Sequence, residues 1–90
     1  MENADLKLDG NAAAGELREI FGAEMTIVRA TCGSCGAVRE MGALSVYLHA
    51  PGTVFRCPGC DAVLVRIVRA EERLWLDPSG VSCLELRTGA

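Results

Sequence analysis

Two pairs of cysteines with Cys-x-x-Cys spacing constrain this chain more than any other feature. Cys32 and Cys35 form the first pair, Cys57 and Cys60 form the second, and 21 residues separate the two pairs. Each pair supplies two thiolates from one tight turn, and a structural zinc ion takes four such ligands in a tetrahedron. The separation slightly exceeds the usual ~15–20 residues, which a longer hairpin would accommodate. The sequence therefore predicts one structural zinc ion bound by Cys32, Cys35, Cys57 and Cys60.

The two pairs belong to a weak internal repeat with an offset of 25 residues, in which residues 32–38 match residues 57–63. Small residues inside each turn let backbone N–H groups face the sulfurs, and such contacts orient a thiolate ligand. Gly36 and Asp61 take the same place after the second cysteine, where a left-handed backbone is often needed. We therefore expect two similar turns that face each other across one ion.

This order of strand, thiolate turn and departing strand resembles a zinc ribbon, also called a rubredoxin-like knuckle pair. The resemblance covers residues 30–70. The expected fold is α+β and mostly β, with one N-terminal helix packed on a rubredoxin-like antiparallel zinc-ribbon sheet.

A chain of 90 residues is one small domain whose core is marginal without help, and a bound metal is one common form of help. We expect a flexible tail over residues 1–8 and a single domain over residues 9–90. Within it, the helix spans 9–22 and the sheet spans 25–87. Aromatic residues are scarce, so the core is expected to be aliphatic.

The helix is predicted from its start signal, its periodicity and its stop signal. Asp9 or Asn11 can cap it, and Gly22 suits a left-handed stop. Its apolar face is expected to consist of Ala13, Leu17, Ile20 and Phe21. We interpret Glu16 and Glu19 as its solvated face.

Six strands are expected between the helix and the C-terminus. The longest has apolar residues on both faces, which is typical of a central strand covered on both sides. The helix would cover one of its faces or pair with another subunit. The predicted strands span residues 25–30, 43–48, 54–56, 62–70, 74–76 and 81–86.

Three further residues have the chemistry for a site, and each has a simpler interpretation. We expect Cys83 to be a small buried hydrophobe rather than a fifth ligand or a reactive thiol. His49 is expected at the surface, because four thiolates already close a tetrahedral shell. Trp75 is expected to fill part of the core, with stacking on a ligand as the alternative.

The formal charge of −3 is unevenly distributed, with −4 on residues 1–24 and +1 on residues 25–90. The seven bases of the second part are all arginines. We interpret them as solubilising side chains that also compensate the charge of the thiolates, with a face for nucleic acid or an acidic partner as the alternative. Arg66 and Arg69 have opposite strand parity, which argues against a single basic stripe.

The expected function is a non-catalytic module that binds an unknown protein partner or acts in regulation. A nucleic-acid-binding ribbon is the main alternative. A rubredoxin-like iron electron carrier is a lesser one. Separately, four tetrahedral thiolates also accept iron on heterologous expression. The second turn resembles that of rubredoxins, but Asp61 stands where they usually carry glycine. A thiol–disulfide enzyme would need a pair that starts a helix, and neither pair precedes a predicted helix.

Several further segments resemble an uncharacterised family of short bacterial proteins, a domain of unknown function. The resemblance rests on residues 8–12, 47–52, 56–61, 75–77 and 83–86 and is nearly full length. It implies a cytoplasmic, metal-binding protein without an assigned reaction. The acidic start and the lack of ~20 consecutive apolar residues also predict a cytoplasmic protein with no membrane partner. The oligomeric state stays open.

Overall fold

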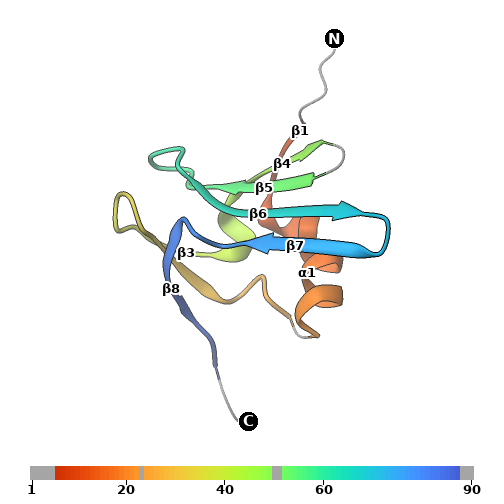
Figure 1. The fold of residues 1–90 in the computed structure, drawn as a ribbon. Coiled ribbons are helices and arrows are strands. Elements are labelled where there is room, and N and C mark those ends of the chain that lie inside the picture. The colour runs from red at the N-terminus through yellow and green to blue at the C-terminus, as the bar shows by residue number, and fades with distance from the viewer. Residues whose placement is uncertain (1–5, 23, 50–51, 88–90) are drawn as a thin grey trace.

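The computed structural model describes residues 6–22, 24–49 and 52–87 of the chain. Within these described residues, eight strands form two antiparallel sheets, and the single α-helix, α1 (Ala14–Phe21), follows the first strand (Figure 1). The predicted α+β, mostly β class is therefore confirmed. The strands are β1 (Leu6–Asp9), β2 (Arg29–Cys32), β3 (Val38–Glu40), β4 (Ser45–His49), β5 (Gly52–Arg56), β6 (Val63–Ala70), β7 (Arg73–Asp77) and β8 (Val81–Glu85).

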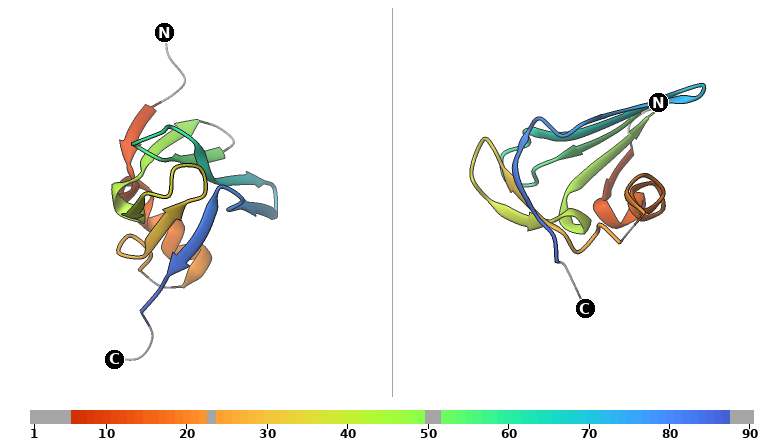
Figure 2. Two further views of the ribbon diagram at one scale, coloured as in Figure 1. Left: turned by 90° about the vertical axis from the view of Figure 1, so that its left-hand side faces the viewer. Right: turned by 60° about the horizontal axis from the view of Figure 1, so that its bottom comes forward.

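The strands divide between a five-stranded sheet and a three-stranded sheet, where the sequence predicted one sheet. The larger sheet has the order β1-β4-β5-β6-β7, and the smaller has the order β3-β2-β8. One cysteine turn joins β2 to β3 in the smaller sheet, and the other joins β5 to β6 in the larger sheet. The two turns lie at the same end of the molecule (Figures 1 and 2). Each sheet therefore contributes one pair of cysteines to this end of the molecule.

The helix has the predicted start and stop. The Asp9 side chain accepts a hydrogen bond from the Asn11 N–H at 3.1 Å and caps a 3-10 helix over Gly10–Ala13, which continues into α1. At the other end, Gly22 has φ 71° and its N–H donates to the Arg18 carbonyl. Glycine adopts this left-handed conformation without the steric cost that a side chain would add.

The core lies between α1 and the face of the larger sheet that points toward it, here called the inner face. Leu17 from the helix and Val46, Phe55 and Ile67 from the sheet are at most 1% exposed. Ala13 is also buried, and Ile20 packs against the core while partly exposed. Phe21 departs from the prediction, since 40% of it is exposed. The helix thus covers the inner face of β6, as one of the two predicted alternatives had it.

The structure corrects the sequence prediction at the N-terminus. Residues 6–8 were expected in a flexible tail, but Leu6–Asp9 pairs with β4 as an edge strand, with Leu8 opposite Val46. Residues 1–5 lie outside the described part of the chain. The alternation of Leu6, Lys7 and Leu8 suits a strand, but four residues are too few to predict one with the partner strand unknown.

The predicted strand over residues 25–30 also starts too early. The Val28 N–H donates to the Met25 carbonyl at 3.1 Å, which closes a turn, and β2 begins only at Arg29. Met25 and Val28 are both buried. Their spacing of three residues brings both side chains into the core through a turn, whereas a strand would place them on opposite faces.

A β-bulge between β5 and β6 changes which side chains of β6 face the core. In β6, Phe55 pairs with Val65 and Arg56 pairs with Val63, so Leu64 is the extra residue. Leu64 and Val65 are consequently both buried. The outward face of β6 carries Arg66, which is exposed. The prediction that β6 is covered on both sides is therefore wrong for this face.

Candidate metal centre

The two cysteine turns have the same backbone structure, as the internal repeat predicts. In the first turn, the Cys32 N–H donates to the Ala37 carbonyl, and the Gly36 N–H donates back to the Cys32 carbonyl. The second turn repeats both bonds 25 residues later, from Cys57 to Ala62 and from Asp61 to Cys57. The left-handed position is also shared, with φ 80° at Gly36 and φ 66° at Asp61. The pattern of turn residues thus encodes the local shape of the site.

The four sulfurs gather into one cluster, within 4.8 Å of one another. Cys32 Sγ lies 3.6 Å from Cys60 Sγ, and Cys35 Sγ lies 3.8 Å from Cys57 Sγ. At a Zn–S distance of about 2.3 Å, the sulfurs of a tetrahedral site lie about 3.8 Å apart. A disulfide would bring two sulfurs to about 2.05 Å. The arrangement therefore fits four ligands of one tetrahedral ion and not a pair of disulfides.

Each turn contributes one buried and one exposed cysteine. Cys32 and Cys57 are 2% and 1% exposed, whereas Cys35 and Cys60 are exposed. The inner sulfurs, those of Cys32 and Cys57, therefore belong to buried residues of the core. The outer sulfurs face solvent, where a chelator or an oxidant can reach them.

Backbone N–H groups stabilise the negatively charged thiolate form of the inner cysteines, Cys32 and Cys57. The N–H groups of Ser34 and Cys35 both lie 3.4 Å from Cys32 Sγ. The pKa of Cys32 is lowered chiefly by the N–H of Cys35, and that of Cys57 is lowered to about 6 chiefly by the N–H of Cys60. Each turn thus favours a thiolate at its first cysteine, which is the form that binds a metal.

Cys35 behaves differently in the absence of an ion. The Ala37 N–H lowers its pKa, but the neighbouring thiols of Cys32 and Cys60 outweigh that contact and raise the pKa to about 11. Crowding by the neighbouring thiols thus favours the protonated form of Cys35. Metal binding at this site must therefore release protons.

Two arginines lie against the second turn. The Arg56 guanidinium donates to the Asp61 carbonyl at 2.8 Å and lies 3.7 Å from its carboxylate. Arg39 reaches over from β3, so that a Cβ placed on Gly59 would lie 3.1 Å from its guanidinium. Both contacts place positive charge next to the cluster.

Gly80, in the turn between β7 and β8, supports the first cysteine turn. Its carbonyl accepts from the Gly33 N–H at 2.9 Å, and its N–H donates to the Leu64 carbonyl at 3.1 Å. A Cβ on Gly80 would overlap the Val63 carbonyl. The β7–β8 turn therefore links the first cysteine turn to the β-bulge at Leu64, which follows the second cysteine turn. Only glycine fits at position 80.

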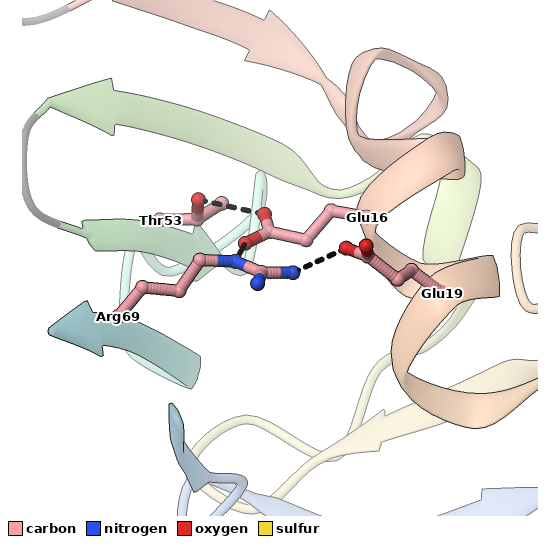
Figure 3. A network of polar contacts seen from close by, with 4 residues as sticks. All are labelled: Glu16, Glu19, Thr53 and Arg69. Atoms are coloured by element: carbon pink, nitrogen blue, oxygen red, sulfur yellow. Dashed lines mark hydrogen bonds and ion pairs between the residues drawn. The ribbon is translucent and has the colours of Figure 1, made fainter. Parts of the chain in front are cut away.

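A second polar cluster, away from the sulfurs, corrects the prediction for Glu16 and Glu19 (Figure 3). Glu16 accepts from the Thr53 hydroxyl at 2.9 Å and from Arg69 Nε at 3.2 Å, and Arg69 also donates to Glu19 at 2.5 Å. Thr53 is only 6% exposed. These side chains tie α1 to β5 and β6 instead of forming a purely solvated face. Arg69 thus serves the fold.

The other predicted residues do not join the metal site. Cys83 is exposed, contrary to the prediction, because the bulge in the β2–β8 pairing leaves Ser82 as the extra residue and turns Val81 and Leu84 to the core. Trp75 is 51% exposed, so the prediction that it fills the core is wrong. The prediction for the His49 side chain lies outside what the structure describes.

Comparison with known proteins agrees with the resemblance to a domain of unknown function. A model of a family of unknown function, DUF6510, matches residues 2–89. The chain belongs to this family. No curated protein and no solved structure matches it. The DUF6510 description names no metal, so the case for one rests on the four sulfurs. None of the helices in the described part of this DUF6510 chain has the length and apolarity to cross a membrane.

Proposed function

We propose that this protein is a small, non-catalytic binding module that a structural zinc ion holds together. The observation that carries the proposal is the set of four sulfurs, with two spacings of 3.6 and 3.8 Å that match a tetrahedral site. Cys32, Cys35, Cys57 and Cys60 would supply all four ligands. A site with four protein ligands leaves no open position for substrate, which distinguishes structural from catalytic zinc.

The position of the cluster supports a structural role. Its ligands come from two sheets, and the Gly33–Gly80 and Gly80–Leu64 backbone hydrogen bonds join the same end of the molecule. An ion bound there would fix the two sheets relative to each other. Structural zinc in small domains contributes about 10–16 kcal/mol of apparent folding free energy, which is large for a chain of 90 residues. Zinc, rather than iron, is the ion we propose, within the reducing cytoplasm.

The experiment is to remove the ion and follow the fold. Zinc-loaded protein should lose the dispersion of its amide proton spectrum when a strong chelator is added, and should regain it when zinc is restored. Cys57→Ser should behave like the chelated protein, whereas Cys83→Ser, the matched control outside the cluster, should behave like the wild type. A spectrum that survives full removal of metal would refute the structural role.

The outward face of the larger sheet favours nucleic acid as a second candidate partner. Alternation along the strands places Tyr47, Arg56, Arg66 and Trp75 on this face, opposite α1. The Arg56 guanidinium lies 5.8 Å from the centre of the Tyr47 ring. Aromatic rings beside arginines are the components that proteins use to bind single-stranded nucleic acid by stacking and phosphate contact.

Fluorescence anisotropy with mixed single-stranded DNA and RNA tests this candidate. Binding should weaken steeply with salt, because phosphate contacts release counterions. Arg66→Gln should weaken it, whereas Arg18→Gln on the far side of α1 should not. Absence of binding at low salt would eliminate nucleic acid and leave a protein as the proposed partner.

A further inference from the structure

β7 is an edge strand with an apolar centre. It pairs with β6 on one side, and no other strand of the described residues pairs with its second side. All five of its residues are exposed, with Leu74 and Leu76 at 37% and Trp75 at 51%. An exposed apolar edge invites pairing with another strand, and proteins usually block such edges with charges, proline or bulges.

The surroundings of β7 leave this edge accessible. The β6–β7 hairpin projects at one side of the molecule, beyond the neighbouring strands β4 and β5 (Figure 1). Beside it, residues of α1, β6, β7 and β8 line an apolar pocket of about 80 Å³ to which Phe21 and Leu76 contribute. Phe21 is 40% exposed. The apolar surface therefore continues from the strand onto the end of the helix.

The order of residues in β7 is complementary to itself. The strand runs Arg73, Leu74, Trp75, Leu76, Asp77. If two copies pair antiparallel about an axis through Trp75, Arg73 lies opposite Asp77 of the second copy, and Leu74 lies opposite its Leu76. The two tryptophans face each other. Opposite charges and apolar pairs directly across an antiparallel ladder are both stabilising.

The edges of the smaller sheet lack this property. In β3, a pairing centred on Arg39 would set Val38 against Glu40. In β8, a pairing centred on Cys83 would set Val81 against Glu85. Each of these pairs an apolar residue with a carboxylate. Self-complementarity is thus a feature of β7 among the edges compared, and not a general consequence of short strands.

We propose that β7 is a homodimer interface, in which two copies of this chain pair β7 to β7 in antiparallel register centred on Trp75. The same surface meets itself across a two-fold axis, so the assembly closes at two copies. The two five-stranded sheets become one continuous sheet of ten strands. Arg73, which forms no ion pair within the described residues, gains Asp77 of the second copy as its partner. The proposal does not depend on the identity of the metal.

Sedimentation equilibrium on the full, metal-loaded chain tests the proposal. We expect a reversible monomer–dimer equilibrium. Arg73→Asp places two like-charged pairs in the interface and should weaken dimerisation by about tenfold or more. Arg87→Asp makes the same change of charge beyond β8 and should leave the dimer unchanged. Trp75→Lys should abolish the dimer, because two ammonium groups would meet on the axis.

Charge reversal tests the register itself. Arg73→Asp and Asp77→Arg should each give monomers, while an equal mixture of the two variants should form heterodimers, since each charged pair across the interface between the two copies is again opposite in sign. Asp77 also accepts from the Ser79 N–H at 3.0 Å, so circular dichroism must first show that Asp77→Arg is folded. The Arg73→Asp variant tests the proposal even if it is not.

Four outcomes would overturn the proposal. The first is a wild-type chain that stays monomeric at several hundred micromolar. The second is a dimer that tolerates both Arg73→Asp and Trp75→Lys, which would place the interface elsewhere. The third is a mixture of folded charge variants that stays monomeric, which would refute the register. Capture of a different protein by monomeric wild type through β7 would also replace a second copy as the occupant.

Discussion

Replacing Gly80 by alanine should damage both the fold and the metal site. The added methyl would overlap the Val63 carbonyl and lie 2.7 Å from Leu64 Cα. These are backbone atoms and cannot rotate away, so the β7–β8 turn must move. Movement breaks the bonds from Gly33 to Gly80 and from Gly80 to Leu64. At about 1 kcal/mol for each bond and about as much again for lost packing, Gly80→Ala should cost about 2–4 kcal/mol.

Urea unfolding at one fixed concentration of free zinc measures this cost, because zinc binds the folded state and adds to its apparent stability. Gly15→Ala is the matched control. Gly15 lies in α1 with nothing within 4 Å of an added Cβ, so this change should stabilise the protein by about 1 kcal/mol. Gly80→Ala should also release zinc faster to a chelator. A Gly80→Ala protein within about 0.5 kcal/mol of the wild type would refute the proposed fastening of the first cysteine turn.

Three other predictions can be tested separately. Glu16→Ala should lower the free energy of unfolding by about 1–3 kcal/mol, because the buried Thr53 hydroxyl loses its acceptor, and a Glu16→Ala/Thr53→Val double mutant should show strong non-additivity in urea melts. Gly36→Ala should lower the free energy of unfolding by about 1 kcal/mol, because alanine is strained at the positive φ of this position. Asp61→Gly should leave the free energy of unfolding unchanged or raise it. Equal effects of the two changes in thermal melts would contradict the shared left-handed turn. Zinc affinity, measured by competition with a chelator, should rise between about pH 6 and pH 8, because the raised pKa of Cys35 means that binding must displace a proton; a pH-independent affinity would show that the thiols are already ionised.

The cysteine turns could be predicted because their structure is local. The spacing inside each pair and the residues Gly36 and Asp61 determine the turn without reference to the rest of the fold. The stop of α1 at Gly22 is local in the same sense. The confirmed class follows from such signals together with the alternating apolar pattern of β4.

The errors come from contacts between distant parts of the chain. Cys83 was expected to be buried as a small hydrophobe in an apolar strand, but the bulge at Ser82 turns it outward. Glu16 resembled a solvated side chain because its partner Arg69 is 53 residues away in sequence. Trp75 was assigned to the core because it is large and apolar. Its apolarity does not reveal that β7 is an edge strand.

The central claim is that one zinc ion holds the two sheets together through Cys32, Cys35, Cys57 and Cys60. Native mass spectrometry of the protein, purified from its own host without a chelator, tests it most directly. The account predicts one zinc per chain with four cysteine protons displaced. Iron in its place would support the electron-carrier alternative, and a metal-free chain short of two or four hydrogens would show disulfides and contradict the account.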